Sequence, residues 1–252
     1  IIGRRKSAAP ESLIILDPRP GDKAQEIIAQ GALHLKLPGK DLAAVECVLL
    51  AVKPQMFDAI GASIAKNIPS DALIISIMAG TTLANLRAVF PEQALIRAMP
   101  NTPAAIGAGI TAFTCDESVG KQQKARAKKL LSAGGAVHEV ESEQLIDVVT
   151  AVSGSGPAYV FHLIETMASA GEAEGLPPEI AMQLAKATVA GAGALAMAAA
   201  ESPAQLRVNV TSPNGTTQAA LEVLMDEKDG FPALVARAVK AATDRSRELA
   251  NG

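Results

Sequence analysis

Two short turns rich in glycine, serine and threonine carry the groups best suited to bind an anion. The first is Ser153-Gly154-Ser155-Gly156-Pro157, and the second runs from Thr211 to Thr217. Each precedes a helical pattern, and the first N–H groups of a helix lack intrahelical partners and carry partial positive charge. The first turn therefore resembles a phosphate-binding turn. The second predicts a carboxylate held by the N–H groups of Gly215, Thr216 and Thr217. A plain helix cap is the alternative for both turns.

Asp17 and Arg19 follow an apolar run, residues 13–16, that has the pattern of a buried strand. A carboxylate at the end of such a strand can bind the ribose hydroxyls of NAD. An arginine two residues later can instead bind the 2′-phosphate of NADP. The sequence leaves NAD and NADP open. The alternative to cofactor binding is a turn built on Asp-Pro with a solvated arginine.

Three further loops follow apolar runs and carry small or polar residues. Ala51-Val52-Lys53-Pro54 would lie beside the nicotinamide half of a dinucleotide, with Lys53 near a phosphate or a substrate carboxylate. Ala79 and Gly80 are small enough to let a ligand approach closely. Asn101 and Thr102 stand between two prolines that fix the backbone, and their side chains can bind a carboxamide or a ribose. Ordinary turns and a rigid crossover loop are the alternatives.

The elements that must position these residues change character along the chain. Up to about Glu141, short apolar runs alternate with helical patterns, which is typical of parallel strands in a doubly wound sheet. Beyond it the strand pattern does not recur, and helical segments follow. We therefore predict an α/β Rossmann-type fold, a doubly wound parallel sheet that binds a dinucleotide, over residues 1–141, and an all-α helical domain over residues 142–252. The predicted strands are 13–16, 45–52, 73–78, 94–99, 110–113 and 136–140, and the predicted C-terminal helices are 158–174, 179–201, 217–225 and 232–250.

The predicted sheet lacks its first strand and the glycine-rich loop that should follow it. A Rossmann-type domain opens with a strand, a Gly-x-Gly-x-x-Gly turn and a helix, and this sequence contains no such motif. The opening residues 1–5 have the character of a helix end, so residues 13–16 would form the second strand. We expect an N-terminal segment of roughly 20 to 30 residues to precede Ile1.

Composition argues against several classes of function. The chain has 23 Lys+Arg against 26 Asp+Glu and no long basic run, so neither nucleic acid nor an anionic membrane is an expected partner. The two cysteines and three histidines do not cluster, so no metal site is predicted. There is no Ser-His-Asp arrangement and no close carboxylate pair either. The chemistry is therefore expected to come from a bound cofactor.

Residues 180–200 are long and apolar enough to span a bilayer. Most of them are alanine, which gives a weak transfer driving force, and the stretch contains Lys186. We predict instead a buried helix whose small residues, among them Gly191 and Gly193, let another helix approach closely. No signal peptide is visible, and a cytoplasmic protein is expected.

Five segments follow one another along the chain: AVKP at 51–54, MAGTTL at 78–83, RAMPNTPA at 97–104, SGSGPAY at 153–159 and NVTSPNGTT at 209–217. In this order they closely resemble the pyrroline-5-carboxylate reductase family across essentially the whole sequence. The last three segments are specific to that family. One departure is Asn214-Gly215, where the family usually has Gly-Gly, but asparagine tolerates a positive φ better than most residues.

The resemblance implies a Rossmann domain joined to a helical domain that binds substrate and forms a homodimer, with dimers often assembled into rings. It implies NAD(P)H-dependent reduction of 1-pyrroline-5-carboxylate, a cyclic imine, to L-proline, the last step of proline biosynthesis. Hydride would add to the imine carbon once the imine nitrogen is protonated, and solvent can supply that proton. Catalysis would then be mainly positioning of the two reactants.

The resemblance also implies roles for individual residues. The Thr217 hydroxyl would hydrogen-bond the imine nitrogen and serve as the catalytic group, while the Gly215 and Thr216 amides would grip the substrate carboxylate. The substrate pocket would be formed, partly across the dimer, by Ser153, Ser155, Asn209, Gly215, Thr216 and Thr217. The cofactor, NADP(H) or NAD(H), would be bound by Asp17, Arg19, Ala51, Val52, Lys53, Pro54, Ala79, Gly80, Asn101 and Thr102.

Two other classes of function are the alternatives. A related β-hydroxyacid dehydrogenase has the same two-domain build but relies on a catalytic lysine in the helical domain, and Lys186 is the only candidate well inside a helix there. A non-catalytic helical dimerisation protein with a degenerate cofactor domain is the other. Binding of a dinucleotide by the intact protein separates this last class from both enzymes.

Overall fold

The structure, a computed structural model, describes residues 9–251. This part of the chain forms two compact units. The α/β unit holds the described residues up to Gly154 together with those from Ala242 onward, and the helical unit is Ser155–Ala241. The C-terminal helix therefore contributes its last turns to the α/β unit.

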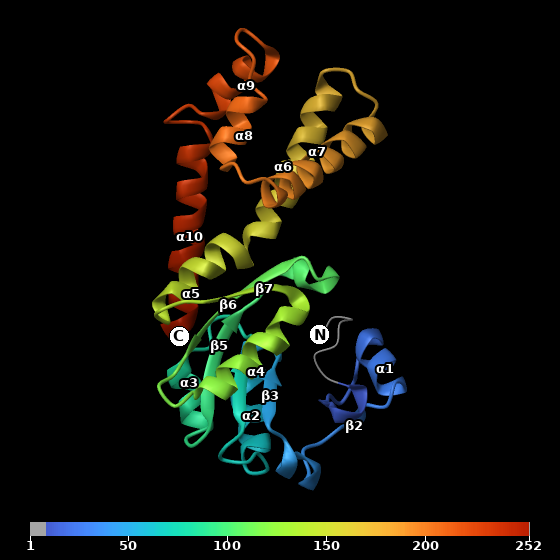
Figure 1. Ribbon diagram of the computed structural model, residues 1–252, viewed down its shortest axis with the longest axis vertical. Helices are drawn as coiled ribbons and strands as arrows, with labels where there is room; N and C mark the ends of the chain where they lie inside the picture. The colour runs from blue at the N-terminus through green and yellow to red at the C-terminus, as the bar shows by residue number, and fades with distance from the viewer. Residues whose placement is uncertain (1–8, 252) are drawn as a thin grey trace. The chain divides into compact units, whose positions relative to one another are not determined.

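A mixed sheet lies at the centre of the α/β unit, and its order among the described residues is β3-β4-β5-β6-β7 (Figure 1). β3, β4 and β5 are parallel, and β6 and β7 are parallel to each other. The predicted doubly wound α/β fold is confirmed. The strands are β3 (Cys47–Leu50), β4 (Leu73–Ser76), β5 (Ala94–Met99), β6 (Gly109–Cys115) and β7 (Gly135–Glu139).

One strand departs from the prediction of a wholly parallel sheet. β6 runs antiparallel to β5, with Met99 opposite Ala112. Two neighbouring parallel strands need a crossover connection of a dozen or more residues, and only residues 100–108 connect β5 to β6. That connection is too short for a crossover, so β6 turns back beside β5.

β1 (Ile14–Leu16) and β2 (Leu33–Leu35) pair in parallel as a separate two-stranded sheet. The strand predicted at residues 13–16 is confirmed, whereas β2 is too short to give a recognisable pattern. In the region that the structure describes, neither strand is hydrogen-bonded to β3. The expected strand and glycine-rich loop before Ile1 stay a prediction, and residues 1–5 lie outside the described residues.

Helices connect the strands of the α/β unit. α3 (Leu83–Val89) begins after Thr82 because the two ends of a capping box satisfy each other: Asn85 N donates to the Thr82 hydroxyl, and Thr82 N donates to the Asn85 side chain. The other helices are α1 (Asp22–Ala29), α2 (Phe57–Ala65), α4 (Lys121–Leu131) and α5 (Gln144–Val149), with single turns η1 (Pro10–Ser12), η2 (Lys40–Ala44), η3 (Pro54–Met56), η4 (Thr102–Ile106) and η5 (Ser132–Gly134) and the π-helix η6 (Thr150–Gly154).

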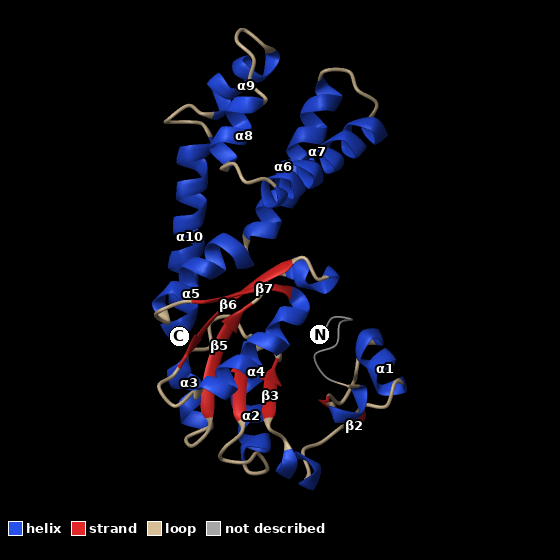
Figure 2. Cartoon of the chain, in the orientation of Figure 1, coloured by secondary structure: helices blue, strands red, loops and turns tan. Residues whose placement is uncertain are grey.

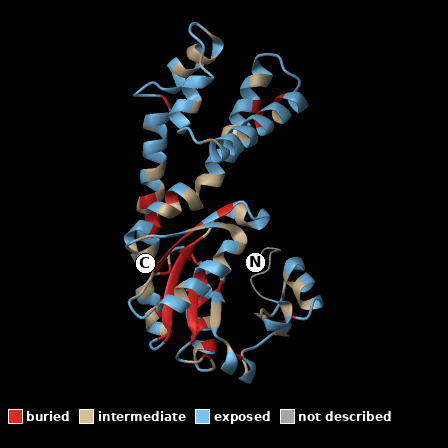
Figure 3. Ribbon diagram, viewed as in Figure 1, coloured by how far each residue is buried: buried red, intermediate tan, exposed pale blue. Residues whose placement is uncertain are grey.

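Successive side chains of β4 enter two different apolar layers. Ile74 belongs to the layer that contains Leu86 of α3, whereas Leu73 and Ile75 belong to the layer that contains Ala127 of α4. Alternation of this kind is what a pleated strand produces. The three β4 side chains are all 0% exposed. The strands of this sheet include the buried stretches coloured red in Figure 3. The sheet is therefore covered by helices on both faces, as a doubly wound fold requires.

The helical unit consists of helices and loops throughout its described residues (Figure 2). The four predicted helices are confirmed, with ends shifted by a few residues. A fifth, short helix was not predicted, although Ser202-Pro203 gives a start signal: the Ser202 hydroxyl accepts from Gln205 N. The helices are α6 (Gly156–Ala173), α7 (Pro178–Ala198), α8 (Pro203–Asn209), α9 (Thr216–Leu224) and α10 (Phe231–Asn251).

α7 is exposed, which contradicts the prediction of a buried helix. It meets α6 through Ala181 and Ala185, but a Cβ built on Gly191 or Gly193 would meet nothing within 4 Å beyond its chain neighbours and the backbone of α7 itself. Within the described residues, α7 is the one helix long and apolar enough to cross a membrane, and 11% of that apolar stretch is buried. The described helical unit therefore leaves this face of α7 uncovered.

The compact units divide later than the predicted boundary between residues 141 and 142. α5 lies beyond that boundary but packs on the sheet, because Ile146 is fully buried with Met99 of β5 and Ala112 of β6. The last turns of α10 join the same unit, where Ser246 Oγ donates to Asp147 Oδ1 at 2.8 Å. The division into a dinucleotide-binding domain, residues 1–141, and a helical domain, residues 142–252, stays a prediction.

Candidate functional site

Three loops with predicted cofactor residues share one edge of the sheet. β3, β4 and β5 are parallel neighbours, so the loops that follow them emerge side by side. These loops carry Lys53, Ala79 with Gly80, and Asn101. Open α/β sheets bind ligands at the carboxyl ends of their strands. The structure thus brings together, at one sheet edge, residues from three of the predicted segments.

The loop after β3 presents its polar residue to solvent. Ala51, Lys53 and Pro54 are exposed and Val52 is half-buried. Lys53 lies just before the single turn η3, and its carbonyl accepts from Met56 N at 2.9 Å. The backbone is thereby fixed while the ammonium group stays in water, where it can meet a phosphate or a carboxylate.

The loop after β4 is closed by the protein's own chain. Gly80 has φ +73, and a Cβ at this position would lie 3.2 Å from the Leu249 Cβ and 3.3 Å from the Leu249 carbonyl oxygen. The close approach that this glycine allows is therefore made by the last turn of α10. Ala79 is exposed. The cofactor roles of Ala79 and Gly80 stay predictions.

The loop after β5 joins two residues that were predicted for different ligands. The Asn101 side chain accepts from Ile110 N at 3.0 Å and donates from Nδ2 to Ser153 Oγ at 3.3 Å. Asn101 was predicted to bind the cofactor and Ser153 the substrate. Thr102 begins η4 and is exposed. The Asn101–Ser153 hydrogen bond therefore ties the two predicted pockets together.

Ser153 lies in the π-helix Thr150–Gly154, which continues α5. Single π turns inside helices are rare and are frequently found at functional sites. The Thr150 hydroxyl donates to the Ile146 carbonyl at 2.7 Å and so satisfies one of the carbonyls that the wider turn releases. Ser155 follows as the residue that precedes α6, and its carbonyl accepts from Ala158 N at 3.0 Å.

Asp17 and Arg19 form a turn of the kind proposed as their structural alternative. Asp17 Oδ1 accepts from Arg19 N at 2.8 Å, and His34 Nε2 donates to the Asp17 carbonyl at 2.8 Å. These contacts fix the turn at the end of β1. Since the described β1 pairs with β2 and not with β3, the structure does not bring these two residues into the sheet that carries the other loops.

In the helical unit, the predicted carboxylate site differs from the prediction at Gly215. Gly215 N donates to the Ser212 carbonyl at 3.1 Å, because the turn folds back on itself before α9. Thr216 and Thr217 are the first two residues of that helix, and the N–H groups at such positions have no acceptor within the helix. Asn214 has φ 56, which confirms that asparagine adopts the positive φ expected of this position.

Asn209 is the last residue of α8, is exposed, and accepts from Gln205 Nε2 at 2.8 Å. It precedes the Thr211–Thr217 turn, so Asn209, Thr216 and Thr217 all belong to the α8–α9 connection and its flanks. The helical unit thus supplies one group of predicted substrate residues, and the α/β unit supplies Ser153.

Arg97 lies in the RAMPNTPA segment, but no role was predicted for it. Arg97 is 1% exposed, and its guanidinium pairs with Glu143 and Asp147 at 2.9 and 3.4 Å. Burying a charged group costs free energy unless the group is paired and hydrogen-bonded, and these two carboxylates supply that pairing. A charged residue four positions before Asn101, inside a strand that is otherwise apolar, is the signal that could have drawn attention to it.

Comparison with known families decides between the classes of function. The family described as pyrroline-5-carboxylate reductase dimerisation matches residues 143–249, and the family described as NADP oxidoreductase, coenzyme F420-dependent, matches residues 2–80. A pyrroline-5-carboxylate reductase from Synechocystis sp. is 45% identical over 97% of this chain and 90% of that relative. This chain belongs to the pyrroline-5-carboxylate reductase family.

Solved structures agree with this membership of the pyrroline-5-carboxylate reductase family. A pyrroline-5-carboxylate reductase from Coxiella burnetii aligns with a TM-score of 0.87 and 34% identity, covering 95% of this chain and 89% of that one. A Plasmodium falciparum pyrroline carboxylate reductase with NADP bound aligns with a TM-score of 0.80 and 27% identity, covering 97% and 93%. Neither a β-hydroxyacid dehydrogenase nor a non-catalytic dimerisation protein is favoured, and Lys186 is an exposed residue of α7.

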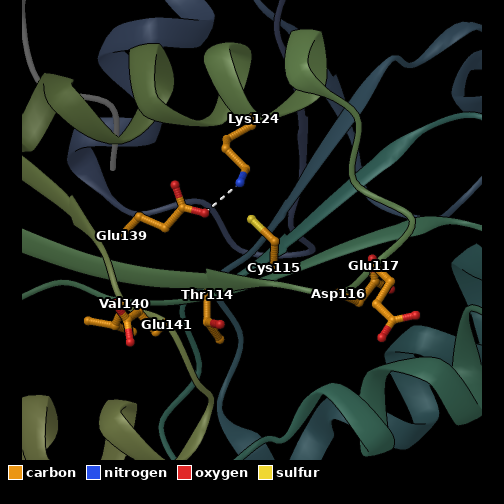
Figure 4. Close-up of a pocket in the computed structure, with 8 residues that line it drawn as sticks. All are labelled: Thr114, Cys115, Asp116, Glu117, Lys124, Glu139, Val140 and Glu141. Atoms are coloured by element: carbon orange, nitrogen blue, oxygen red, sulfur yellow. Dashed lines mark hydrogen bonds and ion pairs between the residues drawn. The ribbon is translucent and has the colours of Figure 1, made fainter.

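A hollow of about 410 Å³ lies at the end of the sheet opposite the carboxyl ends of β3, β4 and β5. Figure 4 shows the side chains that line it. It is lined by the ends of β6 and β7, and because β6 is antiparallel to β5, these ends face away from the loops that carry Lys53 and Asn101. Lys124 Nζ donates to Glu139 at 2.5 Å within it, and burial raises the pKa of the Cys115 thiol to about 11. A thiol with this pKa is a poor nucleophile. None of the predicted site residues lines this hollow.

Cys47 is also an inert thiol, because burial raises its pKa to about 11. The described residues contain no group of three or more His, Cys, Asp or Glu that could hold a metal ion. The predicted site residues discussed above, in the part of the chain that the structure describes, offer hydroxyls, amides, backbone N–H groups and the Lys53 ammonium, all of which can bind and orient a ligand.

Proposed function

We propose that this chain catalyses NAD(P)H-dependent reduction of 1-pyrroline-5-carboxylate to L-proline, the last step of proline biosynthesis. Membership of the reductase family supports the reaction. The observation in the structure that carries the proposal is the hydrogen bond from Asn101 to Ser153, because it links the loop predicted to bind the cofactor with the turn predicted to bind the substrate. A reaction between two bound molecules requires such a common frame.

The residues at the carboxyl edge of β3, β4 and β5 fit a dinucleotide. The exposed Lys53 ammonium suits a phosphate, Ala79 leaves room beside the sheet edge, and the Asn101 carboxamide suits the ribose or carboxamide of a nicotinamide nucleotide. The Plasmodium falciparum relative is described with NADP bound. When bound, the cofactor supplies the hydride. Asp17 and Arg19 are the residues we assign to the choice between NAD and NADP.

The substrate is held by its carboxylate and its ring nitrogen. The N–H groups of Thr216 and Thr217 start α9 and lack partners in the helix, so they and the positive end of the helix dipole suit the carboxylate. The Thr217 hydroxyl then accepts the N–H of the protonated imine, whose proton comes from solvent. Protonation makes the imine carbon electrophilic, and addition of hydride there gives the secondary amine of proline.

The working enzyme is a homo-oligomer. The family match to a dimerisation domain covers residues 143–249, and the apolar face of α7, which the single chain leaves exposed, suits a second copy of the same helical unit. This occupant, rather than a bilayer, is our assignment for α7. We further propose that the dimers assemble into a ring and that the enzyme works in the cytoplasm.

The test of the proposed function is NADPH and NADH oxidation, followed by absorbance, with 1-pyrroline-5-carboxylate and the complete protein. Turnover is expected, and the ratio of the two rates identifies the preferred cofactor. Thr217→Ala should lower kcat/KM roughly 5- to 150-fold, which corresponds to about 1–3 kcal/mol for one hydrogen bond to a charged group. Thr217→Ser, which keeps the hydroxyl, should restore most of the activity.

Thr211→Ala is the matched control for the Thr217 variants. Thr211 belongs to the same turn, but its hydroxyl donates to the Arg207 carbonyl at 2.6 Å and is given no role in binding. It should retain kcat/KM within a small factor. Wild-type activity in Thr217→Ala would remove the catalytic role from that hydroxyl, and a wild-type protein without turnover would overturn the proposed function.

A further inference from the structure

Arg97 holds one face of α5 at two points. Its two terminal nitrogens bind different carboxylates: Nη1 donates to Glu143 Oε1 at 2.9 Å, and Nη2 donates to Asp147 Oδ1 at 3.4 Å. Glu143 immediately precedes α5 and Asp147 lies four residues later, which places both on one side of the helix. A planar guanidinium can span one helical turn in this way, whereas the compact ammonium of lysine cannot.

Each carboxylate is also held from a second direction. Glu143 Oε1 accepts from Leu83 N, the first residue of α3, at 2.7 Å. Asp147 Oδ1 accepts from Ser246 Oγ of α10 at 2.8 Å. Arg97, Asp147 and Ser246 are all buried. With the half-buried Glu143, this cluster joins β5, α3, α5 and the last turns of α10 within the α/β unit.

The two segments joined by Arg97 meet a second time at the site. Asn101 follows Arg97 by four residues, and Ser153 follows Asp147 by six, and these later residues are themselves hydrogen-bonded at 3.3 Å. Between the two contacts, one segment is the end of β5 with Pro100 and the other is α5 running directly into the π-helix. Both are stiff, and Met99 packs on Ile146 between them.

We propose that Arg97 and Asp147 are positioning residues for the reaction. Their ion pair sets where α5 lies along β5, and through these stiff segments it sets the distance at which Asn101 meets Ser153. The loop that binds the cofactor is thereby held against the turn that binds the substrate. This inference rests on the proposed function, and it assigns a catalytic consequence to a cluster that touches neither ligand.

A double-mutant cycle separates positioning from mere structural support. Asp147→Asn keeps the acceptor for Ser246 but removes the charge that Arg97 needs, and it should lower kcat roughly tenfold, since a small misplacement of bound reactants is enough for such a loss. In the Ser153→Ala background, where the Asn101 contact is already lost, the same change should lower kcat about twofold or less. Residues that act through one another are non-additive in this way.

Asp116→Asn is the matched control. Asp116 is likewise an ion-paired aspartate of the α/β unit, bound to Arg87, but it has no contact with α5 among those the structure describes. Its effect on kcat should be the same in both backgrounds, within about twofold. Equal effects of Asp147→Asn in both backgrounds would overturn the proposal. If Asp147→Asn does not fold, the same cycle with Ser246→Ala decides, with an expected loss of about threefold that disappears in Ser153→Ala.

NADPH affinity, measured by fluorescence titration, distinguishes failure of this inference from failure of the proposed function. A wild-type protein that does not reduce 1-pyrroline-5-carboxylate overturns the function. The positioning role is then decided by NADPH binding alone: Asp147→Asn should weaken it several-fold in the wild-type background and leave it unchanged in Asn101→Ala. Equal weakening in both backgrounds would overturn the positioning role independently of the substrate.

Discussion

The two units of this chain bury different kinds of side chain. In the α/β unit, Leu73, Ile74 and Leu95 are 0% exposed, and large apolar side chains fill both sides of the sheet. In the helical unit, the buried apolar cluster of the described residues is Ala168, Ala181 and Ala185. Large apolar side chains of the helical unit lie outside instead, including Phe161 at 58% and Met197 at 87% exposure.

This difference indicates which unit buries large apolar side chains within one chain. Hydrophobic stabilisation grows with the apolar area removed from water, and it must offset the conformational entropy lost on folding. Three alanines remove little area, whereas the layers on the sheet remove much. The α/β unit therefore buries a large apolar core within one chain, whereas the described helical unit leaves apolar surface exposed, which the proposed second copy would cover.

The largest effect is expected from a charge on the exposed face of α7. Ile180, Leu184 and Leu195 recur at a helical spacing along that face and are 44%, 52% and 54% exposed. Leu184→Glu should dissociate the oligomer, because an unpaired charge buried among apolar side chains costs several kcal/mol, and about 1.4 kcal/mol changes the dissociation constant tenfold. Light scattering after size-exclusion chromatography measures the mass, and thermal unfolding should occur at a lower temperature.

Leu37→Glu is the control for the charge itself. Leu37 is 78% exposed in the α/β unit, so the same substitution there should change neither the mass nor Tm appreciably. An unchanged oligomer in Leu184→Glu would show that α7 does not face the second copy, and it would remove the contrast between the two units as we interpret it.

The second prediction tests the core of the α/β unit. Ile74→Ala should lower the free energy of unfolding by about 2–5 kcal/mol, because it removes a fully buried side chain from a packed layer and leaves a cavity. Leu49→Ala in the adjacent strand, where the side chain is 38% exposed, should cost about 1 kcal/mol or less. Denaturant titration measures both. Similar losses at the two positions would contradict the burial that distinguishes this unit.

The sequence was sufficient to predict most of the fold, because long apolar runs and helix-start residues are local signals. β2 is three residues long and gave no such signal. The direction of β6 was not predicted because an apolar run carries no direction, although the short connection after β5 could have indicated it. The exposure of α7 was not predicted because an apolar helix is expected to be covered, whereas among the described residues only 11% of its apolar stretch is buried.

The candidate site was predicted less completely than the fold, for a physical reason. Sequence motifs predicted Asn101 and Ser153 as site residues. Their hydrogen bond, however, joins residues 52 positions apart, and no local pattern encodes such a pair. The Gly215 N–H was expected to bind a ligand, yet the turn uses it for the Ser212 carbonyl. No role was predicted for Arg97 because its partners, Glu143 and Asp147, lie immediately before and within α5, a helix that the sequence did not predict.

A third, smaller effect tests whether the last turn of α10 packs within the α/β unit. Gly80→Ala should lower the free energy of unfolding by about 1–2 kcal/mol for its positive φ, and by more because the new Cβ would lie 3.2 Å from Leu249. Gly107→Ala isolates the first contribution, since Gly107 has φ +75 but no described atom within 4 Å of a Cβ. In denaturant titration, the free energy of unfolding of Gly80→Ala should therefore be lower than that of Gly107→Ala. Equal losses would mean that the last turn of α10 does not pack on this loop.

The smallest effect is expected from the ion pair at the edge of the sheet, because exposed pairs add little to a unit that is stabilised by its core. The hydrogen bond from Lys124 lowers the pKa of Glu139, and the same bond raises the pKa of Lys124. The lowered pKa of Glu139 means that its contribution to stability is present above the ordinary glutamate pKa and is lost as the pH falls through the lowered value. The raised pKa of Lys124 means that its contribution is lost only as the pH rises through the raised value.

Glu139→Gln should therefore lower Tm at pH 7 by about a degree or two, and the difference from wild type should shrink below about pH 4, where an ordinary glutamate is protonated. Added salt should shrink it as well, since exposed pairs are screened. Glu117→Gln removes another carboxylate of the same hollow that has no ion pair among the described contacts, and it should leave Tm at pH 7 close to the wild-type value. A large loss of Tm in Glu139→Gln would mean that surface charge, and not the buried layers, distinguishes the α/β unit from the helical unit.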